Sequence, residues 1–146
     1  MEKSNQENLD QLLKLIDSKN AEIRDATALK LKDLKNDRAI EPLLNSIFRN
    51  RNFNGTMVYA LGSLNCEEHL VNIFRILFYE GYEAKLGAYS ILSEQSFKFS
   101  QDELLNIQKM WKECIANPTK YEGFSNKEII MMMEDAYIGF MEYLEK

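Results

Sequence analysis

Apolar side chains recur every three or four residues along nearly the whole chain, which is the spacing of one face of an amphipathic helix. The pattern is first seen in four residues that share one side of a predicted helix, Leu9, Leu12, Leu13 and Ile16. It predicts eight helices, over about residues 4–17, 21–34, 38–50, a fourth after the turn-like residues 50–54, and then 67–80, 82–94, 101–116 and 126–145. With two prolines and six glycines to interrupt it, the chain is expected to be all-α.

Polar residues ahead of several segments predict where helices begin. Ser100 with Glu103 has the spacing of a capping box, in which the side chain of each residue bonds the backbone of the other. Ser125 with Glu128 has the same spacing and predicts a second capping box for the last helix. Asp37 is expected to cap the third helix.

The helices repeat along the chain. Residues 23–34 align with residues 53–64 at an offset of 30, and every apolar position matches. Ile23 and Phe53, which open the two copies, are therefore expected on the core side. The offset continues into the following helices, and a third copy begins at Ala84 with an offset of 31. Two-helix units that cannot bury their apolar faces alone stack into a solenoid.

The first copy also carries a set of characteristic pairs, Ile23-Arg24, Thr27-Ala28 and the run Asp37-Arg38-Ala39-Ile40. With these residues, positions 21–115 resemble the short HEAT-like repeats, about 30 residues long, of bilin-lyase-type repeat proteins. The resemblance implies stacked helical hairpins joined by Asp and Arg contacts. Asn54 stands in place of the Arg in the second copy, Glu67 in place of the Asp, and Lys85 opens the third, so this ladder of contacts is expected to be incomplete.

The whole chain, residues 1–146, is thus predicted to be a single HEAT-like domain, a short α-solenoid of about eight helices. Residues 1–18 form an N-terminal capping helix in this interpretation, residues 21–116 hold three repeats, and residues 125–146 form a C-terminal helix. The resemblance concerns the fold, because repeats of this kind serve many different partners.

Composition limits the possible partners and compartments. The chain has 18 Lys and Arg residues against 23 Asp and Glu, a net charge of −5, which argues against binding to nucleic-acid phosphates. The sequence contains no run of 18 apolar residues, so it predicts no membrane span, and the chain is expected to be cytoplasmic. Cys66 and Cys114 are expected to be two reduced thiols in the core.

The sequence contains no pattern typical of catalysis. His69 is the only histidine, and its neighbours in the string NCEEHL point in different directions around a helix. Glu67 and Glu68 lie in a first helical turn, where the helix dipole favours acids. A Gly-rich phosphate loop, an HExxH motif and a CxxC motif are all missing from the sequence. The chain is therefore expected to be no enzyme and to need no cofactor or metal.

A docking surface for another protein is the main candidate site. In stacked helical pairs the second helices of the units line one common surface, and solenoid proteins bind partners there. Non-core positions on those helices hold Arg, Tyr and Asn, and the first two are enriched at interface hot spots. The alternative is that these positions form an ordinary solvent-exposed face and bind no partner. The candidate partner-binding residues are Asn45, Arg49, Asn72, Arg75, Tyr79, Asn106, Lys109 and Glu113.

The last helix provides a second candidate surface. Met131 and Ile138 lie seven residues apart and nearly opposite its broad apolar arc, so they form a possible self-association patch or two isolated surface side chains. Residues 125–146 also hold two basic against five acidic side chains, a net charge of −3, which suits a basic partner.

These features predict a non-enzymatic protein-binding module. Small acidic proteins of this kind resemble the immunity proteins that neutralise bacterial toxins, some of which are similar to HEAT repeats, and a basic toxin domain is the expected partner. The alternatives are a bilin-lyase-like or other enzyme-complex component, suggested by the repeat type, and a structural homodimer formed through the last helix.

Overall fold

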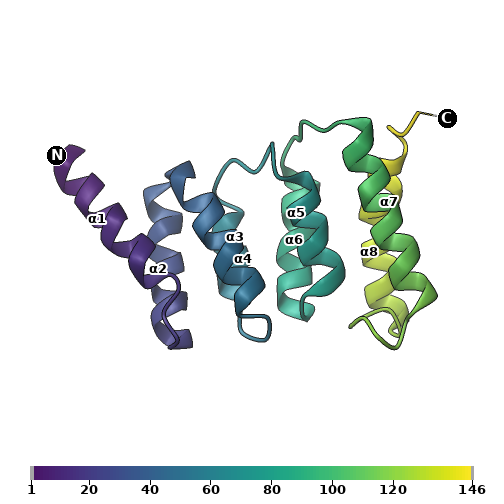
Figure 1. Ribbon diagram of the computed structural model, residues 1–146, viewed down its shortest axis with the longest axis horizontal. Helices are drawn as coiled ribbons and strands as arrows, with labels where there is room; N and C mark the ends of the chain where they lie inside the picture. The colour runs from purple at the N-terminus through teal and green to yellow at the C-terminus, as the bar shows by residue number, and fades with distance from the viewer. Residues whose placement is uncertain (1, 146) are drawn as a thin grey trace. The chain divides into compact units, whose positions relative to one another are not determined.

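The computed structural model describes residues 2–145, and the side chains of residues 8–145. The described residues form eight α-helices and no strand, which confirms the all-α prediction (Figure 1). A short 3-10 helix, η1 (Asp37–Ala39), leads into α3. The helices are α1 (Glu2–Leu15), α2 (Ala21–Leu34), α3 (Ile40–Arg49), α4 (Gly55–Leu61), α5 (Leu70–Tyr79), α6 (Tyr82–Glu94), α7 (Gln101–Ala116) and α8 (Lys127–Met141). The predicted ends of the domain, residues 1 and 146, lie outside the described part of the chain.

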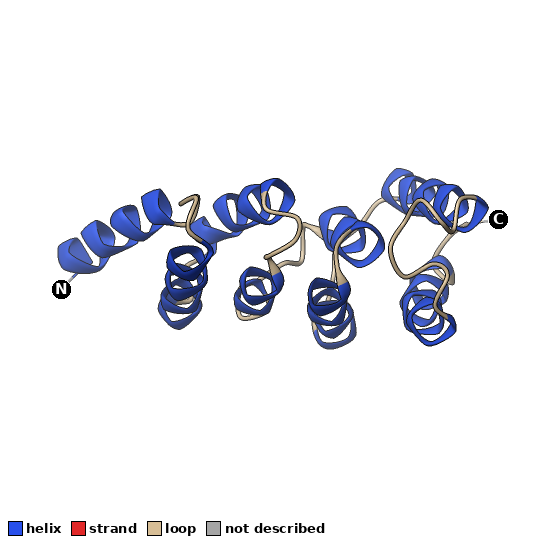
Figure 2. Cartoon of the chain, turned by 90° about the horizontal axis from the view of Figure 1, so that it is seen from below, coloured by secondary structure: helices blue, strands red, loops and turns tan. Residues whose placement is uncertain are grey.

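The chain folds as two compact units, an N-terminal unit that ends at Asn65 and a C-terminal unit that begins at Cys66. Within the N-terminal unit, α1 and α3 lie in one layer and α2 and α4 in the other (Figure 2). Within the C-terminal unit, α5 and α7 form one layer and α6 and α8 the other. Each unit buries apolar residues between its two layers, as amphipathic helices require.

Local capping explains several helix boundaries. Ser100 and Glu103 form the predicted capping box at the start of α7. The second predicted box is wrong, because the residue that caps α8 is Asn126, whose side chain accepts from two backbone amides, while Ser125 Oγ donates to Pro118 O. Asp37 does not cap α3 either: Asn36 caps η1, and the Asp37 carboxylate instead accepts from the backbone amide of Asn65.

Two residues expected in the core are exposed. Ile23 is 42% exposed and Phe53 is 70% exposed, whereas the polar residue that follows each of them, Arg24 or Asn54, is buried. Phe53 also precedes the first residue of α4, so the helical spacing does not apply to it. In both cases a tertiary hydrogen bond of the polar residue fixes which side of the segment faces inward.

Three residues that the repeat offset aligns, Arg24, Asn54 and Lys85, form the same kind of hydrogen bond. Arg24 Nη1 donates to the carbonyl of Ser18, just beyond the end of α1. Asn54 Nδ2 donates to the carbonyl of Ile47 near the end of α3. Lys85 Nζ donates to the carbonyls of Leu77 and Phe78 near the end of α5. The last carbonyls of a helix have no partner within the helix, and a cation there also suits the helix dipole.

Candidate functional site

Six of the eight candidate partner-binding residues lie on α5 and α7, which are adjacent helices in one layer of the C-terminal unit. They are referred to below as the α5–α7 face. The three on α5 are half-buried and the three on α7 are exposed. The residues of this face are Asn72, Arg75 and Tyr79 on α5 and Asn106, Lys109 and Glu113 on α7.

Side-chain contacts order part of this face. Arg75 Nη1 donates to Asn72 Oδ1 at 3.1 Å. The Tyr79 ring packs on the Tyr121 ring, with centroids 5.6 Å apart, and Tyr121 Oη donates to Glu113 Oε1 at 3.3 Å. Tyr121 thus joins a residue of α5 to a residue of α7. Sequence reasoning missed it, because it lies in the connection between α7 and α8, which has no helical spacing.

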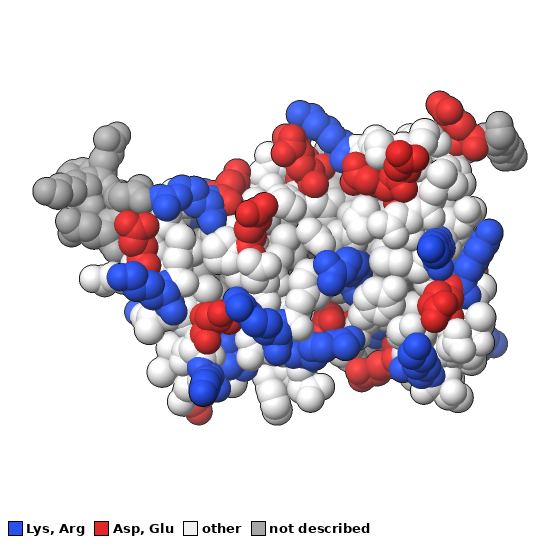
Figure 3. All heavy atoms as spheres, in the orientation of Figure 1, with Lys and Arg blue, Asp and Glu red and all other residues white. Residues whose placement is uncertain are grey.

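The α5–α7 face combines uncharged and charged groups. Burial raises the pKa of Tyr79. Over α5 and α7, Lys and Arg side chains lie among uncharged atoms, and Asp and Glu gather at the edge where α7 begins (Figure 3). Arg and Tyr side chains are enriched at protein interfaces.

The other two candidate residues, Asn45 and Arg49, lie on α3 in the N-terminal unit and are exposed. Arg49 forms an ion pair with Asp17, and both side chains remain largely in solvent. The predicted rows from Asn45 and Arg49 to the residues of α5 and α7 stay a prediction.

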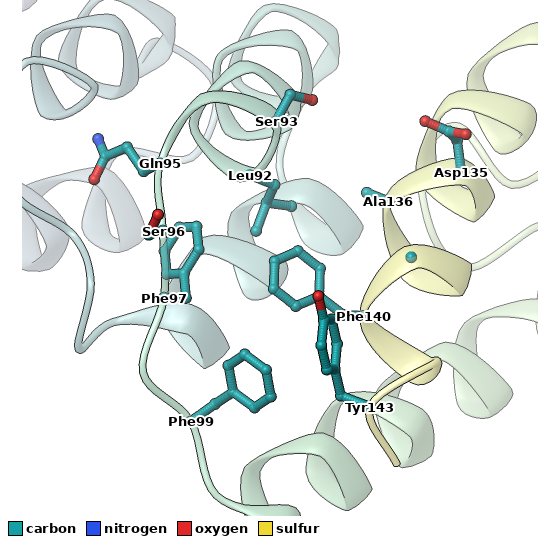
Figure 4. Close-up of a pocket in the computed structure, with 11 residues that line it drawn as sticks. Leu92, Ser93, Gln95, Ser96, Phe97, Phe99, Asp135, Ala136, Phe140 and Tyr143 are labelled. Carbon is teal, nitrogen blue, oxygen red and sulfur yellow. The ribbon is translucent and has the colours of Figure 1, made fainter.

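A second candidate site is a groove of about 500 Å³ in the C-terminal unit, lined by the end of α6, the following loop, the last turns of α8 and Tyr143 just beyond α8 (Figure 4). Its apolar lining comes from Leu92, Phe97, Phe99, Ala136, Gly139, Phe140 and Tyr143. Polar lining residues lie at the sides, and they are Ser93, Gln95, Ser96 and Asp135.

Aromatic contacts fix the walls of this groove. The Phe97 and Phe99 rings meet the Phe140 ring edge to face, with centroids 5.8 Å and 5.9 Å away. Phe99 also meets Tyr143 at 5.5 Å, and Phe140 packs on buried Phe74 at 5.4 Å. Edge-to-face pairs are favoured by the ring quadrupoles. The walls are therefore held in place by packing, and Phe74 connects them to the core.

The sequence pattern did not reveal the groove. Phe140 and Tyr143 belong to the apolar arc of the last helix, which predicts only that they are buried. Phe97 and Phe99 alternate with Ser96 and Lys98 in a short loop, and this alternation is the one signal that two rings face the same way.

Lys85 is a fully buried cation in the C-terminal unit. Besides its two carbonyl acceptors, its Nζ lies 3.8 Å from Met133 Sδ and 5.7 Å from the centroid of the Phe124 ring. Burial lowers the pKa of Lys85 to about 8, and the nearby acid Glu122 offsets part of that effect. The residue connects the end of α5 to the loop before α8, which is a structural role.

Replacing Lys85 by Met is expected to change the pH dependence of stability. The pKa of Lys85 is about 8 in the native chain and about 10.4 in the unfolded chain. Between these two pH values the unfolded chain still holds a proton on Lys85 that the native chain has lost. The stability of the wild type therefore rises with pH in this range. From pH 7 to pH 9.5 the free energy of unfolding of the wild type should rise by about 2 kcal/mol relative to that of Lys85→Met. Urea unfolding at both pH values measures this, with exposed Lys112→Met as the control. If the wild type and Lys85→Met differ in free energy of unfolding by the same amount at both pH values, the prediction is wrong.

The candidate self-association residues lie on α8. Met131 is 61% exposed and Ile138 is 51% exposed, so both side chains are accessible in the chain by itself. Self-association through them stays a prediction. Light scattering on wild type and on Met131→Ser with Ile138→Ser measures it directly.

None of the titratable residues singled out from the sequence lines the groove. His69 precedes the first residue of α5, and its side chain makes no capping bond there. Cys66 and Cys114 are buried and form no disulfide in the described structure, and burial raises the pKa of Cys114 to about 11. Within residues 8–145, no group of three His, Cys, Asp or Glu side chains has the arrangement of a metal site. None of the described helices combines the length and the apolar character that crossing a membrane requires.

Comparison of the chain with family models, with curated proteins and with solved structures finds no match.

Proposed function

We propose that the chain is a non-enzymatic protein-binding module whose partner docks on the α5–α7 face. The observation that carries this proposal is the ordered cluster on two adjacent helices, in which Arg75 is held by Asn72 and Tyr79 is held against Tyr121. Pre-ordered Arg and Tyr side chains lose little conformational entropy on binding, so a partner that contacts them retains most of the interaction energy.

The proposal includes the repeat architecture. Three residues aligned by the offset, Arg24, Asn54 and Lys85, each donate to carbonyls at or just beyond the end of the preceding helix. A helical hairpin that repeats this contact has the same connection to its predecessor each time, as in a HEAT-like α-solenoid. In this proposal the repeat places Asn45 and Arg49 of α3 at positions equivalent to Arg75 and Tyr79 of α5.

Within this class we propose an immunity protein that neutralises a toxin by binding it. The charge distribution supports it: residues 101–146 hold 5 basic against 9 acidic side chains, which accounts for 4 of the 5 net negative charges. An acidic inhibitor attracts a basic toxin domain over long range and gains association rate. Toxins that act on nucleic acids need basic surfaces, which an acidic protein complements.

The test uses the reading frame adjacent to the one that encodes this chain. The product of that frame should arrest growth when expressed alone, and co-expression of this chain should restore growth and yield a complex on purification. Growth arrest that this chain does not relieve, together with no complex, would reject the immunity proposal.

Arg75→Glu is expected to weaken that complex more than tenfold, because the substitution removes the guanidinium group that Asn72 holds in place for contact with the partner. The melting temperature should stay the same, since the side chain is half-buried and lies outside the core. Titration calorimetry measures the affinity. Lys30→Glu, an exposed residue of α2 with the same change of net charge, is the control, and equal affinities for the two variants would exclude the α5–α7 face.

A further inference from the structure

The groove between α6 and α8 has an apolar lining and is more than large enough to accept one large apolar side chain of a bound segment. Leu92, Ala136 and Phe140 line it, and the Phe97 and Phe99 rings, which contact Phe140 and Tyr143, line it from the loop (Figure 4). A volume of about 500 Å³ is within the range of ligand pockets. Tyr143 is 63% exposed, so this wall has apolar surface left to cover.

Gly139 lines the groove and leaves open space beside α8. A Cβ atom at this position would have no atom within 4 Å, so the space beside the helix is open. Gly139 lines the groove one residue before Phe140. A larger residue at position 139 would therefore enter the groove without displacing the fold.

The charge around the groove is negative. Asp135 is exposed and lines the groove, and residues 125–146, which supply one side of it, hold two basic against five acidic side chains. The Asp135 carboxylate accepts a 2.6 Å hydrogen bond from Tyr89 Oη, which holds it at the edge. The one basic residue of the loop, Lys98, forms an ion pair with Glu67 at 3.5 Å.

We infer that this groove binds a basic segment of a partner protein, with one aromatic or large aliphatic side chain in the groove and a Lys or Arg side chain beside Asp135. Charge complementarity selects this occupant, because an acidic segment would meet the Asp135 carboxylate and the net negative charge of residues 125–146. An apolar anchor surrounded by charged contacts is a common arrangement of peptide sites. The inference rests on the proposed protein-binding function and adds a second contact surface to it.

The test uses a labelled peptide, KKFKK, blocked at both ends, and fluorescence anisotropy at low ionic strength. Wild type should bind KKFKK at least tenfold more tightly than KKAKK, which lacks the anchor, and should not bind EEFEE in the same range. Equal binding of KKFKK and KKAKK would show attraction to surface charge alone and would overturn the inference. Failure to bind KKFKK at millimolar protein would also overturn it.

Variants at one position locate the site. Gly139→Phe should weaken KKFKK binding more than tenfold because its ring would compete with the Phe side chain of the peptide for the groove, whereas Gly139→Ala should leave binding unchanged. Asp135→Lys, at an exposed position, is the second variant and should weaken binding of KKFKK at least threefold without affecting the core. Unchanged binding in Gly139→Phe and Asp135→Lys would place the peptide elsewhere.

The two proposals fail separately. Peptide binding is measured on the chain alone, so its loss would leave the complex formed through Arg75 intact. If the product of the adjacent reading frame does not bind but KKFKK binds in the groove, the immunity proposal fails and the groove remains a site for basic segments.

Discussion

Replacing Phe78 by Ala is expected to lower the free energy of unfolding of the C-terminal unit by about 3–5 kcal/mol. Phe78 lies on α5 and is fully buried. Its ring lies 5.4 Å from Phe74, 5.6 Å from Trp111, 6.2 Å from Phe124 and 6.5 Å from Tyr137, measured between centroids. These partners come from α5, α7, the loop before α8 and α8, so no single element can close the cavity by moving.

A matched substitution in the same chain provides the control. Phe53→Ala removes the same atoms at a position that is 70% exposed, and its effect should stay within about 0.5 kcal/mol. Urea unfolding followed by Trp111 fluorescence reports on the C-terminal unit, because Trp111 is the only tryptophan. Far-UV circular dichroism follows the whole chain. Similar losses of unfolding free energy in Phe78→Ala and Phe53→Ala would contradict the buried position of Phe78.

The helices that were predicted most accurately have short-range signals at their ends. The expected bounds of α2, α6 and α7 agree with the structure, and α7 begins at its capping box. The start of α8 was predicted less well because two adjacent residues, Ser125 and Asn126, are both good caps, and the choice follows from the bond of Ser125 to Pro118 O. That bond spans seven residues and has no sequence pattern.

The errors in the predicted core have a common physical cause. Hydrophobicity favours burying Ile23 and exposing Arg24, but the end of the preceding helix leaves a carbonyl that needs a donor. Arg24 reaches the carbonyl of Ser18 and is buried, so Ile23 turns toward solvent. The sequence pattern alone, without these tertiary contacts, predicts the opposite, with Ile23 buried and Arg24 exposed.

The two candidate surfaces differ in how far the sequence could predict them. The residues of α5 and α7 follow helical spacing, so their place on non-core positions could be worked out from the offset between copies. The groove depends on Phe97 and Phe99, which come from a loop whose path is fixed by tertiary bonds such as Lys98 N to Glu67 O at 2.8 Å. The wall across the groove comes from α8, about 40 residues later, and no local pattern connects the two.

Gly123→Ala is expected to destabilise the C-terminal unit by about 3 kcal/mol, the sum of backbone strain and overpacking. Gly123 has a φ of 92°, a region that side chains other than glycine rarely adopt. A Cβ there would also lie 2.8 Å from Ile129 Cγ2 and 3.1 Å from Lys85 Cε. Lys85 is held by two carbonyls and has little room to move, so the strain should spread to the loop and to α8.

The control is the same substitution at Gly139, where a Cβ meets no atom within 4 Å. Gly139 lies inside α8, and Ala has the higher helix propensity, so Gly139→Ala should stabilise the unit by about 0.5–1 kcal/mol. Urea unfolding of the two variants by Trp111 fluorescence therefore should give changes of opposite sign. A neutral Gly123→Ala would mean that the loop before α8 does not pack on Lys85, and would remove the connection between the buried cation and the last helix.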